Sequence, residues 1–226
     1  MLKIENLQFG YSGGLHNPLS IEIRTGRLVL LLGTNGSGKS TLLRTLSGIL
    51  PPAAGMLKYD QKSIHTMTEK QRAKIMAYVG SKQTSFSGLL VEEVVSLGAW
   101  SAGKSIDVDA LLSAHDLLKL AKKRISEISD GEAQKVMLAR AIAQQTPVLL
   151  MDEPTAFLDH PTRKTWWTSM LQLVSDGKTV IMSTHDIAFI PENHPAIVAL
   201  CIPASRGEVV VLERVDRVGV ERFFGL

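Results

Sequence analysis

Apolar and polar residues alternate along the first two segments of the chain. Residues 2–9 and 19–23 carry apolar side chains at nearly every second position, and the turn-rich stretch 12–18 separates them. A period of two places the apolar side chains on one face of a β-strand. Two strands of a half-solvated sheet are therefore expected at the start of the chain.

Strand and helix patterns alternate through most of the remaining chain. The run 28–32 is entirely apolar and is too short for anything but a buried strand. A helix is expected over 39–47 because Gly48 follows it, and a second over 69–74 because Thr68 and Gln71 form a capping box. A third helix is expected from Pro161 to about Val174. Further strands are expected at 56–59, 75–79, 148–151, 178–183, 197–202 and 208–212. This alternation predicts an α/β fold with a mostly parallel sheet, whose ligand site lies at the carboxyl ends of the strands.

The middle of the chain has a different pattern. From 81 to about 143 there is no convincing strand pattern, whereas 91–99, 107–118 and 132–143 have helical spacing. The helix over 107–118 is expected to begin after Asp107 as N-cap. Its apolar face would hold Val108, Leu111, Leu112, His115 and Leu118. We therefore expect a helical subdomain over about 84–143, inserted into a single domain that spans 1–226.

Composition excludes several classes of protein. The net charge of +3 is mild and is not gathered into a Lys/Arg block, so nucleic-acid binding is not expected. No apolar run approaches the roughly 18 residues of a membrane span, and the first ten residues lack the form of a signal peptide. The single cysteine, Cys201, lies in an apolar run and is expected in a buried strand. These features predict a protein that stays in the cytoplasm.

The segment Gly33 to Thr41 reads GTNGSGKST and directly follows the apolar run 28–32. It meets the pattern G-x-x-x-x-G-K-[ST], and strand, glycine loop and helix is the context in which that pattern cradles phosphates. Lys39 is expected to reach the β- and γ-phosphates, and the Ser40 hydroxyl to ligate Mg²⁺. The expected nucleotide-binding loop comprises Gly33, Thr34, Asn35, Gly36, Ser37, Gly38, Lys39, Ser40 and Thr41.

Two carboxylates follow the apolar run 148–151. The fold brings them to the sheet edge that holds Lys39. Asp152 is expected to hold Mg²⁺ beside Ser40, directly or through water. Glu153 is expected to orient and deprotonate the water that attacks the γ-phosphate.

A capped helix start, Ser129-Asp130-Gly131-Glu132, precedes the helical stretch 132–143, with Ser129 or Asp130 as the N-cap. The order of motifs along the chain resembles that of a known protein family. GTNGSGKST, ISDGEAQKVMLARAI, VLLMDEP, AFLD and a strand that closes in Ser183-Thr184-His185-Asp186 together resemble the ATP-binding subunit of an ABC transporter. The resemblance covers essentially the whole chain and implies a P-loop NTPase core with an N-terminal antiparallel β subdomain.

The resemblance implies roles for five further positions or segments. The segment 129–132 (Ser129, Asp130, Gly131, Glu132) would contact the γ-phosphate of ATP bound to the other subunit of a homodimer. His185 would hydrogen-bond the γ-phosphate, and Asp159 would lie in the loop that bridges the two sites. Tyr11 would stack on adenine, with Phe9 two residues away as an alternative. The other histidines, His16 among them, are expected to have no role.

The chain departs from the family at the loop after 77–79. The family usually has a glutamine there that contacts Mg²⁺ and relays the nucleotide state to the membrane partner, and the aligned residue is Ser81. Either Ser81 acts through a water or Gln83 takes the place of the glutamine. The S-D-G-E form of 129–132 and the segment LLVEEVVSLG resemble the importers of iron chelates, haem and cobalamin.

The resemblance implies an ATPase that binds ATP and Mg²⁺ and powers import from the cytoplasmic face of the membrane. Its implied partners are a second ATPase subunit, integral membrane permease subunits and an extracytoplasmic substrate-binding protein. A non-transport ABC ATPase, such as an assembly or DNA-handling factor, would use the same site. A nucleotide-gated scaffold without turnover is disfavoured because Glu153 is present.

Overall fold

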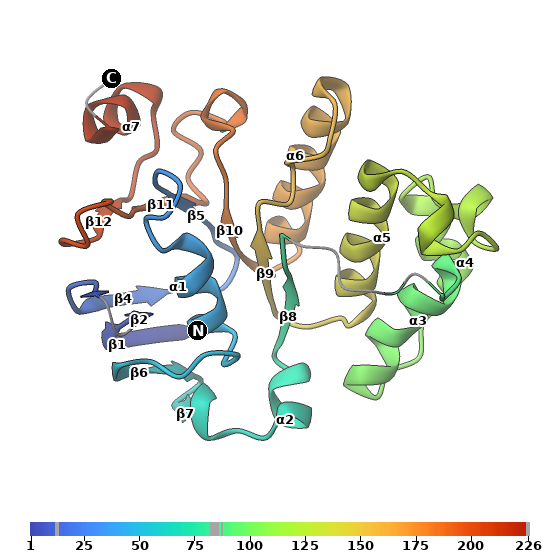
Figure 1. Ribbon diagram of the computed structural model, residues 1–226, viewed down its shortest axis with the longest axis horizontal. Helices are drawn as coiled ribbons and strands as arrows, with labels where there is room; N and C mark the ends of the chain where they lie inside the picture. The colour runs from blue at the N-terminus through green and yellow to red at the C-terminus, as the bar shows by residue number, and fades with distance from the viewer. Residues whose placement is uncertain (12–13, 82–85, 87, 225–226) are drawn as a thin grey trace.

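The computed structural model describes residues 1–11, 14–81, 86 and 88–224. Figure 1 shows a small sheet of early strands, a larger central sheet and a group of helices beyond β8. The described helices are α1 (Lys39–Leu46), α2 (Glu69–Ala73), α3 (Val91–Ala102), α4 (Val108–Ala114), α5 (Asp130–Ala143), α6 (His160–Ser175) and α7 (Arg217–Phe224).

The central sheet has six strands in the order β12-β11-β5-β10-β9-β8. All neighbouring pairs are parallel except β11 with β12. Its strands are β5 (Leu28–Leu32), β8 (Met76–Val79), β9 (Val148–Asp152), β10 (Thr179–Ser183), β11 (Ile197–Cys201) and β12 (Val210–Leu212). In register, Ser183 pairs with both Asp152 and Leu31. The carboxyl ends of β5, β9 and β10 therefore lie side by side.

Four strands within residues 2–63 form a separate antiparallel sheet in the order β4-β1-β6-β7. Its strands are β1 (Leu2–Gln8), β4 (Leu19–Ile23), β6 (Ala54–Tyr59) and β7 (Lys62–Ser63), and a two-stranded ribbon of β2 (Gly10–Tyr11) and β3 (Gly14–Leu15) follows β1. The expected alternation of β1 is observed, since Leu2, Ile4 and Leu7 are buried.

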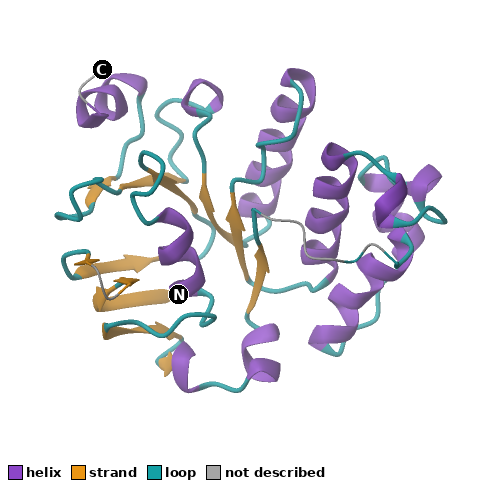
Figure 2. Ribbon diagram, viewed as in Figure 1, coloured by secondary structure: helices purple, strands orange, loops and turns teal. Residues whose placement is uncertain are grey.

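Burial on both faces explains why the central strands read as continuous apolar runs. Leu28, Leu30 and Leu32 belong to a cluster with α6 and the helices α3 to α5, whereas Val29 and Leu31 pack with α1 and the N-terminal sheet. Figure 2 shows α1 on one side of these strands and α6 on the other. Cys201 is fully buried in β11, as expected, and burial raises the pKa of its thiol to about 11.

The helices between β8 and β9 follow the expected insertion, and α3 packs closely on α5. A Cβ atom on Gly98 would lie 2.0 Å from the Arg140 carbonyl oxygen, so only glycine permits this approach of the two backbones. The Arg140 guanidinium carbon lies 5.4 Å from the centroid of the Phe86 ring.

The expected helix over 107–118 is too long. Asp107 caps α4 through the Ala110 amide, but the helix ends at Ala114. Asp116 adopts a φ of 58°, and the Leu117 amide donates to the Leu112 carbonyl oxygen at 2.8 Å. This left-handed termination leaves Leu118 outside α4, in a 3₁₀ turn (Leu118–Leu120), and 47% exposed.

Several elements were not predicted from the sequence. These are the ribbon β2–β3, the short strand β7, the helix α7 and the 3₁₀ turns Ile64–Thr66, Ile125–Glu127 and Ile187–Phe189. Apart from α7, each strand or turn has only two or three residues, which span too few periods for a pattern to emerge.

Candidate functional site

The loop Gly33 to Ser40 connects the end of β5 to α1 at the carboxyl edge of the sheet. A Cβ on Gly33 would lie 2.3 Å from Ser37 Oγ and 2.7 Å from the Ile202 carbonyl oxygen, so the loop can close only on a glycine. Gly38, with φ of 103°, is the residue before the first turn of α1. The glycines thus let the chain reverse and present the amino end of α1 to an anion.

The Lys39 side chain lies back along this loop. Its Nζ donates to the carbonyl oxygens of Gly33 at 2.8 Å and Thr34 at 3.2 Å, and lies 3.9 Å from Glu153 Oε1. Burial lowers the pKa of Lys39, while the charges of Glu153 and Asp152 oppose this change. The ammonium is therefore held above the loop, close to both acids.

Asp152, at the end of β9, is fully buried and accepts two hydroxyl hydrogen bonds at Oδ1. Ser40 Oγ donates at 3.0 Å and Ser183 Oγ at 2.7 Å. The other oxygen, Oδ2, is buried and has no hydrogen-bond partner among the described residues. A buried carboxylate oxygen without a partner is costly, and carboxylate and hydroxyl oxygens are ligands that Mg²⁺ prefers. The residues present fit a magnesium ion.

Glu153 has a left-handed backbone, with φ of 51°, directly after the strand. Its amide donates to Ser183 Oγ at 2.8 Å, and its Oε1 lies 2.7 Å from His185 Nε2. Burial raises the pKa of Glu153; Asp152 and Asp186 add to this effect, and Lys39 opposes it. The backbone strain turns the carboxylate away from Asp152 and toward His185.

His185 follows β10, and its imidazole is about half exposed. Burial, followed by the charge of Lys39, lowers its pKa, so the ring is neutral at neutral pH and its Nε2–H donates to Glu153. The next residue, Asp186, accepts from Arg163 Nη1 at 3.0 Å and from Thr155 Oγ1. These contacts fix the loop that carries the histidine.

A cavity of about 540 Å³ opens over the loop and is lined by residues of five regions. Tyr11, 59% exposed, lies at its rim, whereas Phe9 is buried and stacks on His16 with 4.4 Å between ring centroids. Of the two aromatic residues expected to contact adenine, Tyr11 is therefore the exposed one. Ser81 also lines this cavity, and Gln83 lies outside the described residues.

The segment 129–132 lies at a second cavity, of about 490 Å³, together with Asp159. Ser129 is the N-cap of α5, which decides between the two expected caps. Its amide and its Oγ each donate to Glu132 Oε2 at 2.8 Å, and these two hydrogen bonds lower the pKa of Glu132. Asp159 caps α6 through the Thr162 amide at 2.9 Å. Of all these residues, none lines the cavity over the phosphate loop.

Residues 16–156 match the family model for the ABC transporter. The chain belongs to this family. It is 35% identical over 210 residues to the iron(3+)-hydroxamate import ATP-binding protein FhuC of Bacillus subtilis, covering 86% of this chain and 75% of that protein. It is 34% identical over 198 residues to the hemin import ATP-binding protein HmuV of Pseudomonas entomophila, covering 83% and 78%.

Among solved structures, a dimeric ATP-binding cassette in a post-hydrolysis state with ADP and Pi has a TM-score of 0.81 at 23% identity. The match covers 96% of this chain and all of that one. This likeness establishes the fold, with its antiparallel N-terminal sheet and parallel core. The chain is thus an ABC-type ATPase subunit, as the order of its motifs indicated. No helix among the described residues is long and apolar enough to cross a membrane.

The structure adds three residues to the ABC site that the sequence did not assign. The Ser183 hydroxyl donates to Asp152 and accepts from the Glu153 amide. This role follows from the pairing of Ser183 with Asp152 in the sheet, which the sequence alone does not show. His16 is buried against the loop, 2.8 Å from where a Cβ on Gly38 would stand. Phe157 is 52% exposed and lines both cavities.

Replacing Ser183 with alanine tests whether this hydroxyl positions both acids. The change removes an acceptor for the Glu153 amide and a donor to Asp152 in a buried setting, so Ser183→Ala is expected to lower the unfolding free energy by about 1–3 kcal/mol. Urea denaturation measures the loss, with the exposed Ser113→Ala in α4 as control. Equal stability of the two variants would show that Ser183 does not hold the acids.

Proposed function

We propose that this chain hydrolyses ATP to power import of an iron chelate, haem or cobalamin across the cytoplasmic membrane. The convergence of Lys39, Ser40, Asp152 and Glu153 at one sheet edge is the observation that carries the ATPase part. The choice of cargo is supported by two relatives, whose names give iron(3+)-hydroxamate and hemin as the imported compounds. We treat residues 1–226 as one ABC-type ATPase domain with a helical subdomain over about 84–143.

Binding rests on the loop and one aromatic side chain. The amides of residues 33–41 and the amino end of α1 would surround the phosphates, and the buried Lys39 ammonium supplies positive charge at the γ end. The exposed Tyr11 offers a face for adenine. Mg²⁺, when bound, would neutralise charge on the phosphate oxygens. Ser40 and Asp152 would hold it, and its fit rests on the unpartnered Asp152 Oδ2.

Glu153 is the proposed general base. Its raised pKa makes the carboxylate a better proton acceptor than an ordinary glutamate, and the proton of the attacking water would move to a carboxylate oxygen. The 2.7 Å contact with His185 orients that carboxylate. When ATP is bound, the Nε2–H of the neutral His185 imidazole would donate to the γ-phosphate instead of to Glu153.

The site is proposed to be completed by a second copy of the chain. Ser129 and Gly131 line a cavity distinct from that of their own phosphate loop, so a phosphate bound at Lys39 would contact them only from a partner subunit. Phe157, which lines both cavities, and Asp159, which lines the second, would contact the partner. Symmetry then gives two equivalent sites per dimer.

The remaining partners follow from the proposed role in transport. Permease subunits would cross the membrane, and an extracytoplasmic binding protein would deliver the cargo; this chain would lie at the cytoplasmic face. The helices α3 to α5 are the proposed docking surface for the permease. Ser81, which lines the nucleotide cavity, is the proposed link between that surface and the nucleotide, through a bridging water.

Two substitutions separate binding from chemistry. Lys39→Ala is expected to abolish ATP binding because the loop loses its buried charge. Glu153→Gln is expected to keep binding and to slow turnover by about 10²–10⁴-fold, the typical contribution of a general base. Fluorescent nucleotide binding and phosphate release measure the two effects. Turnover of Glu153→Gln within threefold of wild type would exclude Glu153 as the base.

The Glu153→Gln variant, which lacks the proposed general base, also tests whether two copies of the chain form a dimer. With Mg-ATP, Glu153→Gln is expected to double in mass by light scattering, since two unhydrolysed nucleotides link the copies. Ser129→Trp, which fills the second cavity on an exposed helix cap, is expected to bind ATP and remain a monomer. A monomeric Glu153→Gln protein at high concentration with Mg-ATP would contradict the shared site.

The cargo is tested by uptake into cells of the source organism. Deleting the gene is expected to remove uptake of one labelled compound among a ferric hydroxamate, haem and cobalamin, and the wild-type gene restores it. Lys39→Ala is the matched control, since it is expected to leave the chain folded without restoring uptake. Unchanged uptake of all three compounds in the deletion strain would exclude the proposed import.

A further inference from the structure

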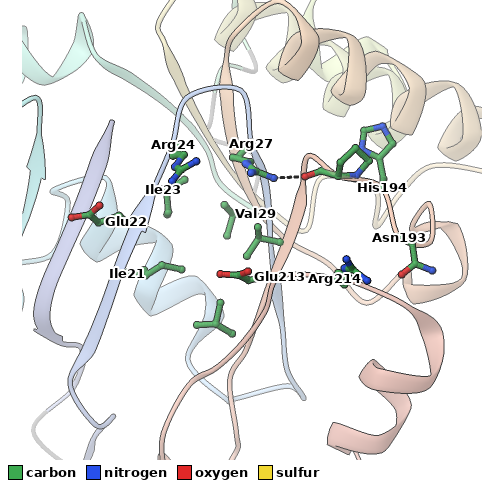
Figure 3. A pocket seen from close by; sticks show the side chains of 13 residues that line it. Ile21, Glu22, Ile23, Arg24, Arg27, Val29, Asn193, His194, Glu213 and Arg214 are labelled. Carbon is green, nitrogen blue, oxygen red and sulfur yellow. Dashed lines mark hydrogen bonds between the residues drawn. The ribbon is translucent and has the colours of Figure 1, made fainter.

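A cavity of about 700 Å³ lies at the sheet edge opposite the phosphate loop (Figure 3). It is bounded by the end of β4, the start of β5, the segment before β11 and the end of β12. β5 separates it from Gly33, and five residues of strand extend about 16 Å. The cavity is therefore independent of the nucleotide site. Its size is in the range of small-molecule sites, about 300–1,000 Å³.

Part of the cavity wall is apolar. Ile21 of β4, Val29 of β5, Val198 of β11 and Val211 of β12 line it. The strands β4 and β12 are each the last strand of their sheet. These side chains can receive an apolar group between the two sheets.

Three arginines surround the same space. Arg24, Arg27 and Arg214 line the cavity, and among the described residues Arg24 and Arg214 have no hydrogen-bond or ion-pair partner. Two acids are also present. They are Glu22, which lies 3.6 Å from Lys3 Nζ, and Glu213. The cavity thus has an excess of positive charge.

Of the three arginines, Arg27 is held in place by a hydrogen bond. Arg27 Nη1 donates to the Pro195 carbonyl oxygen, as the dashed line in Figure 3 shows, and the Leu28 amide donates to the Ala196 carbonyl oxygen at 2.9 Å. His194 Nδ1 accepts from the Ala196 amide at 3.3 Å, so the proton of the neutral ring is on Nε2, which is then a donor.

We propose that this cavity binds a small organic anion, with an apolar body against Ile21, Val29, Val198 and Val211 and a carboxylate or phosphate at the arginines. Guanidinium groups bind such groups through paired hydrogen bonds, and the unpartnered arginines supply them. Because the cavity and the phosphate loop lie at opposite ends of β5, the anion and ATP bind together.

Fluorescence titration with dansylglycine tests the proposal, and dansylamide, which has the same ring system without the carboxylate, is the matched probe. Dansylglycine is expected to bind at least tenfold more tightly than dansylamide, and saturating Mg-ATP on Glu153→Gln is expected to leave the affinity unchanged. Equal affinity for the two probes, or displacement by Mg-ATP, would overturn the proposal.

Substitutions locate the site. Arg24→Gln and Arg214→Gln are each expected to weaken dansylglycine on the order of tenfold, the value of one charged hydrogen bond. Arg222→Gln removes the same charge from an exposed position in α7 and is expected to bind as wild type. Val198→Trp is expected to abolish binding by filling the cavity. Retained ATP binding confirms the fold of each variant, and wild-type affinity in both Arg24→Gln and Arg214→Gln would overturn the proposal.

Discussion

The buried carboxylate of Asp152 is the interaction on which the rest of the site depends. One of its oxygens accepts hydroxyl hydrogen bonds from Ser40 at the start of α1 and Ser183 at the end of β10. It therefore fixes a helix and a neighbouring strand relative to β9. Ser183 in turn accepts from the Glu153 amide, and this contact holds the strained residue that follows the strand. These hydrogen bonds therefore fix the positions of the two acids and the phosphate loop relative to one another.

The sequence predicted the parts of the site that depend on short continuous motifs. The apolar run 28–32, the loop that follows it and the pair Asp152-Glu153 could be recognised because their chemistry requires fixed spacing along the chain. The strands of the central sheet were predictable for a different reason. Burial on both faces produces continuous apolar runs that few other structures require.

Other parts depend on contacts between residues far apart in sequence. The role of Ser183 arises from register across two strands, and that of His16 from a ring stacked beneath the loop. The end of α4 depends on a left-handed aspartate at 116, a conformation that sequence pattern does not specify. The arginines around the cavity opposite the phosphate loop come from two segments far apart in sequence, 24–27 and 214, so no local pattern connects them.

The contact between α3 and α5 has a mechanical consequence. At Gly98 the two backbones meet with no side chain between them that could be compressed or change rotamer. A force applied to α3 is therefore transmitted to α5 without loss in side-chain rearrangement. Ser129 lies at the amino end of α5, so a displacement of α3 by a bound protein would move this hydroxyl as part of one rigid body. The stiffness of this helix pair depends on the absence of a single methyl group, the Cβ that any other residue would carry at position 98.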